Sequence, residues 1–137
     1  MKNISCLIIV ACALLSCEPT RNKDMISGQF AHSVFIWLNN PNSEADKTKL
    51  ESGLKELIEN SLYIRSAHLG VPARTDREVV DNSYSYHLIV TFGSKEAQDK
   101  YQVEPAHKKF LDDCSNLWTK VLIYDSMNVL QEGENLK

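Results

Sequence analysis

The sequence predicts an α+β domain with the element order β-α-β-β-α-β. Four short runs rich in β-branched and aromatic residues have the composition of strands, and the stretches between them repeat apolar residues at helical spacing. This order is that of the ferredoxin-like arrangement, an antiparallel sheet with its helices on one face. The first strand is apolar on both faces, and the third and fourth are partly so. A second copy of the sheet is therefore expected to cover the face without helices, giving a dimer.

The first strand is predicted over "HSVFIWL", residues 32–38. One face carries His32, Val34, Ile36 and Leu38, and the other carries Phe35 and Trp37. A turn follows over residues 39–42, and Ser43 with Asp46 three residues later resembles a capping box. The helix that begins there repeats its apolar residues at helical spacing, and these are Leu50, Leu54, Leu57, Ile58 and Leu62.

Three further strands are predicted over residues 64–71, 86–92 and 120–125. A short helix is expected after Ser94, which is a good capping residue. Pro105 favours the first turn of another helix and requires an extended conformation at Glu104.

The helix after Pro105 places a histidine on its apolar stripe. The stripe is predicted to contain His107, Phe110, Leu111, Cys114, Leu117 and Trp118. Burial and the helix N-terminus both disfavour a charged imidazole, so His107 is expected to be neutral at pH 7. A neutral imidazole can accept a proton, and the phenol of Tyr101 can donate a hydrogen bond to a developing oxyanion. A core histidine and a packing tyrosine remain the alternative interpretation of this pair.

The N-terminus predicts an export signal. Lys2 precedes an apolar run over residues 4–15, which is too short to span a bilayer, and the small residue Ser16 follows. The ending "LLSC" resembles the lipobox of bacterial lipoproteins. This resemblance implies that Cys17 carries lipid (palmitate) and becomes the first residue of the mature chain.

Two alternatives remain open, a plain signal peptide cut near Ala13 or Ser16 and a cytosolic domain translated from Met25. We favour the lipoprotein, which is expected in the bacterial cell envelope, anchored to the membrane on its periplasmic or surface side. Removal of the signal and acylation of Cys17 leave one cysteine, Cys114, so no intramolecular disulfide is expected. Cys114 lies on the apolar stripe and is interpreted as a packing residue rather than a nucleophile.

Composition limits the remaining possibilities. The 137 residues, 43% hydrophobic and 24% charged, suit one globular domain. A net charge of −3 without a cluster of lysines or arginines argues against a nucleic-acid partner. We divide the chain into a signal peptide (1–16), a lipidated N-terminus and tether (17–30), the domain (31–127) and a C-terminal tail (128–137).

Residues 32–38 and 83–125 resemble the stress-responsive dimeric α/β-barrel (Dabb) domain family. The specific parts are the histidine that opens the first strand, the Tyr-x-x-x-Pro-x-His block, the tryptophan before the last strand and the "YD" at its end. The resemblance covers roughly residues 31–126. It implies a ferredoxin-like protomer whose sheets pair into a dimeric α/β barrel.

One branch of this family, a plant cyclase, closes a linear polyketide by aldol condensation without a cofactor. Its Tyr–His pair matches Tyr101 and His107, which are therefore the candidate catalytic residues. The resemblance also implies a ligand pocket lined by His32, Val34, Ile36, Phe110, Trp118, Val121 and Ile123. Two residues depart from the pattern, because Glu104 stands where the family often has histidine and Leu111 where the cyclase has glycine.

Three functions are considered. The first is a lipid-anchored homodimer that binds a small molecule, with the ligand unknown. The second is a cofactor-independent lyase, cyclase or isomerase that acts on a carbonyl compound through His107 and Tyr101. The third is a haem-binding or monooxygenase-like relative, for which no haem-ligand motif is present. We favour the first, because an exported protein is separated from activated cytosolic thioesters. No cofactor and no metal are expected, since the four histidines lack metal-ligand spacing.

Overall fold

The computed structural model describes residues 26–130. The predicted signal peptide, Cys17 and much of the predicted tether and tail lie outside the described residues. The elements in order are β1 (Phe30–Leu38), α1 (Glu44–Asn60), β2 (Ser66–Gly70), β3 (Tyr86–Phe92), α2 (Lys95–Val103), α3 (Pro105–Cys114), the 3₁₀ turn η1 (Ser115–Leu117) and β4 (Trp118–Met127). Among these residues no helix is long and apolar enough to cross a membrane.

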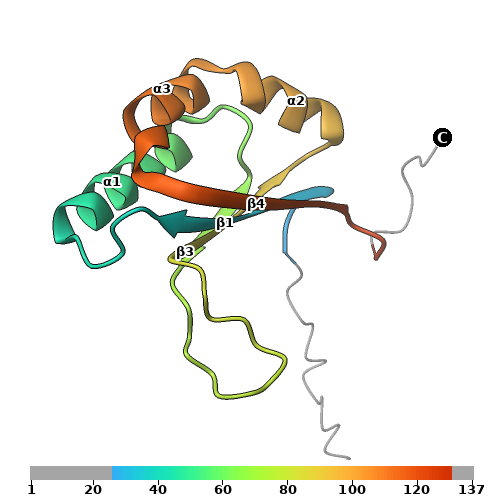
Figure 1. Cartoon of the computed structure of the whole chain (residues 1–137). Helices are drawn as coiled ribbons and strands as arrows, with labels where there is room; N and C mark the ends of the chain where they lie inside the picture. Colours follow the sequence, from blue (N-terminus) through green and yellow to red (C-terminus); the bar gives the residue numbers. More distant parts are fainter. Residues whose placement is uncertain (1–25, 131–137) are drawn as a thin grey trace, which may run out of the picture.

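The four strands form one antiparallel sheet with the order β2-β3-β1-β4. The three helices lie on the same face of this sheet, and the segment between β2 and β3 extends away from it on the opposite side (Figure 1). The predicted ferredoxin-like βαββαβ protomer is confirmed, with its second helix divided into α2 and α3. The central position of β1 explains why this strand is apolar on both faces.

The first helix begins as its sequence predicts, but it ends at Asn60, so the predicted stripe residue Leu62 lies beyond it and is exposed. The Ser43 hydroxyl accepts a hydrogen bond from the Asp46 backbone N–H at 3.2 Å, which satisfies one of the free N–H groups of the first turn. Leu50, Leu54 and Leu57 are buried beneath the helix. Burial of each leucine side chain stabilises the fold by about 2 kcal/mol.

The break between α2 and α3 positions two polar aromatic side chains. Glu104 has an extended conformation (ψ 156°), and Pro105 then begins α3, as expected for a residue before proline. Tyr101 therefore lies in the last turn of α2 and His107 in the first turn of α3. The predicted helical stripe was too long, because α3 ends at Cys114, Leu117 belongs to the 3₁₀ turn, and Trp118 already opens β4.

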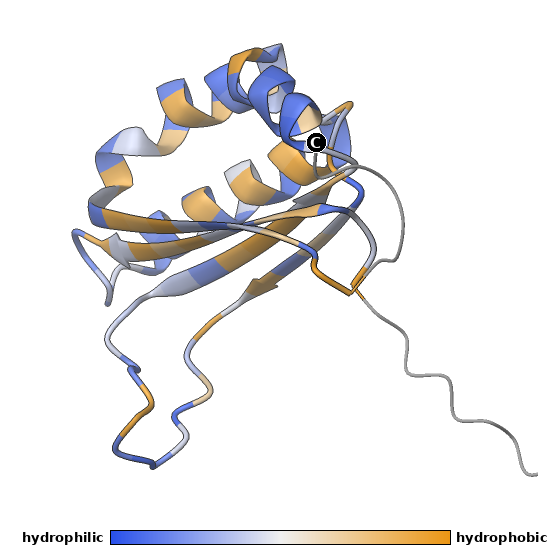
Figure 2. Ribbon diagram, turned by 90° about the vertical axis from the view of Figure 1, so that its right-hand side faces the viewer, coloured by the Kyte–Doolittle hydropathy of each residue, from blue (hydrophilic) through white to orange (hydrophobic). Residues whose placement is uncertain are grey.

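Hydrophobic residues recur along the strands (Figure 2), and the strand pairing places some of them on each face of the sheet. The inner face packs against the helices and includes Ile36, Leu88, Val90 and Phe92, which are all buried. We call the opposite side the outer sheet face, and its main residues are Ser33, Phe35, Trp37, His87, Ile89, Leu122 and Tyr124. No helix among the described residues covers it (Figure 1).

Close packing of α1 against α3 depends on Gly53. A Cβ added there would lie 2.6 Å from the Cys114 Sγ, so we expect Gly53→Ala to lower the free energy of unfolding by about 1–3 kcal/mol. Thermal or denaturant unfolding measures the loss. The control is Ser52→Ala, at an exposed position on the same helix, which is expected to have little effect. The Gly53→Ala penalty should shrink in a Cys114→Ala background, and an equal loss in both backgrounds would contradict this explanation.

Candidate functional site

A cavity of about 220 Å³ lies between the helices and the inner face of the sheet. Its lining includes every candidate catalytic and pocket residue from the sequence, namely His32, Val34, Ile36, Tyr101, His107, Phe110, Trp118, Val121 and Ile123. The structure thus brings together side chains from β1, β4, α2 and α3 that are far apart in the chain. Their part in binding or catalysis stays a prediction. We call this space the central cavity.

Sequence reasoning missed several further lining residues, which are Leu54, Leu57, Leu88 and Gln102. Leu54 and Leu57 were predicted only as apolar residues of the first helix, because apolar spacing does not distinguish a side chain that packs from one that borders a void. Leu111 also lines the cavity and is 38% exposed. It therefore lies where the cavity meets solvent. A leucine at this position narrows the opening more than a glycine would.

The His107 imidazole has a defined tautomer. Its Nδ1 lies 3.2 Å from the Gln102 carbonyl oxygen, which can only accept, so Nδ1 carries the proton and Nε2 keeps its lone pair. Burial lowers the pKa of His107, the hydrogen bond to Gln102 opposes this, the neighbouring His32 lowers it further, and Glu104 raises it. The net direction is downward. His107 is therefore neutral at pH 7 and can accept a proton at Nε2.

Tyr101 supplies a phenol beside this base. Its side chain is 2% exposed, and the centroids of its ring and the His107 ring are 4.5 Å apart. Burial, and then the nearby Glu104 charge, raise the pKa of Tyr101, so the hydroxyl stays protonated. Within residues 26–130 this hydroxyl makes no hydrogen bond, and it is free to donate one to a ligand.

His32 is the third polar group of the central cavity. It is directly opposite Asp125 in the pairing of β1 with β4, and its Nδ1 lies 2.6 Å from Asp125 Oδ1. The Asp125 carboxylate, bonded to Nδ1, fixes the orientation of the imidazole. Asp125 was not predicted as a site residue. Its position beside His32 follows from the cross-strand register of β1 and β4, which the sequence alone does not specify.

These three groups lie among mostly apolar lining residues, where hydrogen bonds are stronger than in water. A ligand hydroxyl can donate a hydrogen bond to the neutral imidazole and accept one from the protonated phenol, whereas a carbonyl oxygen can accept one from the phenol. The volume is below the usual range of about 300–1,000 Å³ for drug-sized ligands, so the arrangement suits a smaller molecule.

Residues 26–130 contain no cluster of metal-ligating side chains and no exposed thiol. No group of three histidine, cysteine or acidic side chains in this part of the chain could hold a metal ion. Cys114 is buried against α1, and burial raises the pKa of its thiol. A buried thiol with a raised pKa is a poor nucleophile.

The titration of His107 provides a direct test of its environment. We expect its pKa to lie below the usual histidine value of about 6.5, because burial disfavours the imidazolium. Since the unfolded chain then binds the proton more readily, this residue destabilises the fold progressively as the pH falls through about 6.5. Histidine ring NMR over a pH series measures the midpoint. A midpoint at or above 6.5 would contradict the prediction.

Comparison with known proteins identifies a family and a fold. The family model described as Stress responsive A/B Barrel Domain matches residues 30–128. No curated protein matches the chain. Among solved structures, a Dabb family protein from Mesorhizobium loti with a ferredoxin-like fold is 16% identical, with a TM-score of 0.62 over 75% of this chain and 99% of that chain.

Two other structural relatives are informative. The hydroxynitrile lyase from Passiflora edulis is 12% identical, with a TM-score of 0.66 over 76% of this chain and 96% of that chain. A dimeric ferredoxin-like protein of unknown function from Thermobifida fusca is also 12% identical, with a TM-score of 0.60 over 76% of this chain and 95% of that chain. At these identities the likeness shows a shared fold.

Proposed function

This chain belongs to the stress responsive A/B barrel domain family, and on that premise we propose that it is a homodimer that binds a small molecule in the central cavity. The observation that carries the proposal is the convergence of His32, Tyr101 and His107 in one small apolar space. Perturbed acid–base groups in a pocket are the usual mark of a ligand site.

The homodimer is supported by the outer sheet face. Phe35, Leu122 and Tyr124 lie together there, and Leu122 and Tyr124 are 37% and 60% exposed in the single chain. A contiguous apolar surface of this kind is the signature of an interface. The Thermobifida fusca relative is described as dimeric, and the same face of the sheet is the natural place for two copies of this chain to meet.

The binding function can be tested with a small aromatic ketone, acetophenone, whose carbonyl oxygen could accept a hydrogen bond from the Tyr101 hydroxyl beside His107. Amide NMR of the protein with increasing acetophenone is expected to show saturable shifts that cluster around these two residues and the strands beneath them. Shifts that do not saturate, or that scatter over the surface, would count against the proposal.

Envelope location is the second part of the proposal. The lipobox-like ending at Cys17 supports an acylated N-terminus that anchors the domain to a membrane. We expect the native protein to enter the detergent phase of a Triton X-114 extraction and Cys17→Ser to remain in the aqueous phase, since one thiol carries the anchor. A native protein found in the aqueous phase would exclude the anchor.

The alternative function is a cofactor-independent lyase, cyclase or isomerase that acts on a carbonyl compound, and the free lone pair of His107 favours it. The lyase named among the structural relatives suggests a hydroxynitrile as a probe. In its cleavage, His107 Nε2 would take the hydroxyl proton while Tyr101 donates a hydrogen bond to the same oxygen. The carbon–carbon bond to the nitrile breaks, a carbonyl forms, and cyanide leaves with the electron pair and then takes up the proton.

Mandelonitrile allows this alternative to be measured, because its cleavage releases benzaldehyde, which absorbs in the ultraviolet. Release above the buffer rate that disappears in Tyr101→Phe and His107→Ala would establish lyase activity. Release no faster than in buffer would dismiss cleavage of hydroxynitriles by this site.

A further inference from the structure

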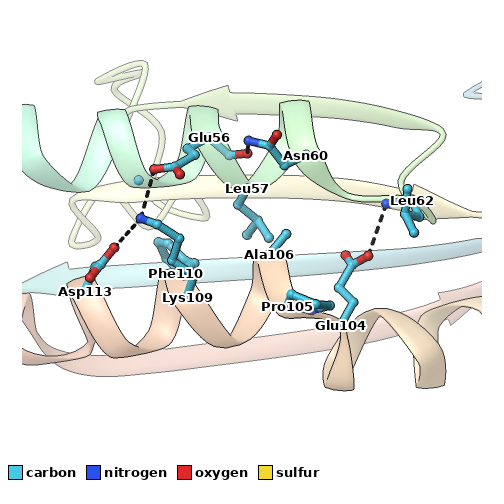
Figure 3. Close-up of a pocket in the computed structure, with 11 residues that line it drawn as sticks. Glu56, Leu57, Asn60, Leu62, Glu104, Pro105, Ala106, Lys109, Phe110 and Asp113 are labelled. Carbon is cyan, nitrogen blue, oxygen red and sulfur yellow. Dashed lines mark hydrogen bonds and ion pairs between the residues drawn. The ribbon is translucent and has the colours of Figure 1, made fainter.

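A second hollow lies between α1 and α3, with a volume of about 340 Å³ (Figure 3). We call it the interhelical groove. Its apolar walls include Leu57 of α1, Phe110 and Ala106 of α3, and Leu62, which is 82% exposed at the rim. Leu57 and Phe110 also line the central cavity, so the two spaces share a wall. Tyr101 and His107 do not line the groove.

Glu104 lies at one end of this groove, where it is buried with one carboxylate oxygen unpaired among the described residues. Its side chain is only 5% exposed, and its Oε2 accepts a hydrogen bond from the Leu62 backbone N–H at 3.1 Å. Its other oxygen, Oε1, is buried and has no hydrogen-bond partner among the described residues. An unsatisfied buried acceptor costs about 1–3 kcal/mol, and more when it is charged. A group that bonds to Oε1 would recover this free energy.

The other charged groups of the groove already satisfy one another. Lys109 reaches Glu56 at 3.2 Å and Asp113 at 2.6 Å, and all three lie toward the end of the groove away from Glu104 (Figure 3). Among the carboxylates that line the groove, Glu104 is the one without a cationic partner. The groove therefore offers one unpaired acid beside an apolar surface.

We propose that the interhelical groove is a second ligand site, which binds a small organic amine. The ammonium group bonds to Glu104 Oε1, and the apolar body lies against Leu57, Leu62 and Phe110. Because the terminal torsion of glutamate is broad, the carboxylate can turn Oε1 toward the groove and keep one oxygen on the Leu62 N–H. A metal ion fits less well, since residues 26–130 contain no group of three metal-ligating side chains. The proposal does not depend on the function of the central cavity.

Benzylamine is a suitable probe, with benzyl alcohol as a neutral probe of nearly the same shape. We expect saturable benzylamine binding, seen as NMR shifts at the amides of Leu62, Glu104 and Ala106, and binding of benzyl alcohol at least tenfold weaker. Glu104→Gln is expected to weaken benzylamine binding by at least tenfold, because a hydrogen bond to a charged partner is lost. The glutamine oxygen can still accept from the Leu62 N–H, so the fold should be kept.

The matched control is Glu59→Gln, which removes the same charge from an exposed position of α1 outside the groove and should change the benzylamine affinity less than twofold. A second variant, Leu62→Lys, introduces a competing ammonium at an exposed rim position and is expected to abolish binding. Equal binding of the amine and the alcohol, equal losses in Glu104→Gln and Glu59→Gln, unchanged affinity in Glu104→Gln or Leu62→Lys, or shifts centred on Tyr101 and His107 would each overturn the proposal.

Discussion

Replacing Phe35 by glutamate is expected to turn the proposed dimer into a monomer. Phe35 is central on the outer sheet face, where its ring stacks on His87 with centroids 4.1 Å apart and meets the edges of Tyr84 and Tyr124. Trp37 is a less decisive position, because Lys120 Nζ already lies 4.2 Å from the centre of its ring. A charge buried at the centre of an interface would weaken association by about 3 kcal/mol or more.

A loss of that size raises the dissociation constant on the order of 100-fold. Analytical ultracentrifugation over a concentration series measures the change. Val103→Glu is the matched control, since Val103 is 62% exposed on α2, away from the outer sheet face, and its variant should remain dimeric. A Phe35→Glu protein that is still dimeric, or a native protein that is monomeric at micromolar concentration, would contradict the assembly through this face.

Replacing Tyr101 by phenylalanine is expected to weaken acetophenone binding by about tenfold, and replacing His107 by alanine is expected to weaken binding of the corresponding alcohol, 1-phenylethanol, by about tenfold. Each change removes one hydrogen bond, the one that the alcohol hydroxyl donates to His107 Nε2 or the one that the Tyr101 hydroxyl donates to the ketone oxygen, worth about 0.5–1.5 kcal/mol. If mandelonitrile is cleaved, loss of the His107 base should lower the rate by about 10²–10⁴. Isothermal titration measures the affinities, and benzaldehyde release measures the rate.

Stability distinguishes this role from that of a core histidine. The His107 Nε2 is not needed for the fold, and the bond from Nδ1 to Gln102 is a single hydrogen bond, so His107→Ala should cost about 1 kcal/mol in the free energy of unfolding. A core residue would give the opposite pattern. A loss of several kcal/mol together with unchanged binding of 1-phenylethanol would assign His107 to structure alone.

Local signals in the sequence were sufficient for much of the fold. Tyr86–Phe92 is a strand with the predicted bounds, and the Ser94 and Ser43 caps begin α2 and α1 because capping depends on residues three positions away. The end of α3 was missed because Leu117 and Trp118 keep helical spacing after the helix has stopped. Apolar spacing indicates which side chains are buried. It does not indicate which backbone conformation buries them.

The candidate site was predictable only in part, for a related physical reason. Tyr101 and His107 are near each other in sequence, so the proline break between them was enough to suggest that they meet. The pairing of His32 with Asp125 spans 93 residues and depends on strand register. The bond from the Leu62 N–H to Glu104 likewise depends on how a loop after α1 packs against the start of α3, which no local pattern encodes.

A crystal structure of the protein grown with acetophenone tests the central claim most directly, because it reports on the assembly and the central cavity together. We predict two protomers joined through their outer sheet faces. Each central cavity should hold one ketone whose oxygen lies within about 3 Å of the Tyr101 hydroxyl, the usual length of such a hydrogen bond. Protomers that meet through another surface, or a central cavity that remains empty while the ketone binds elsewhere, would contradict the account.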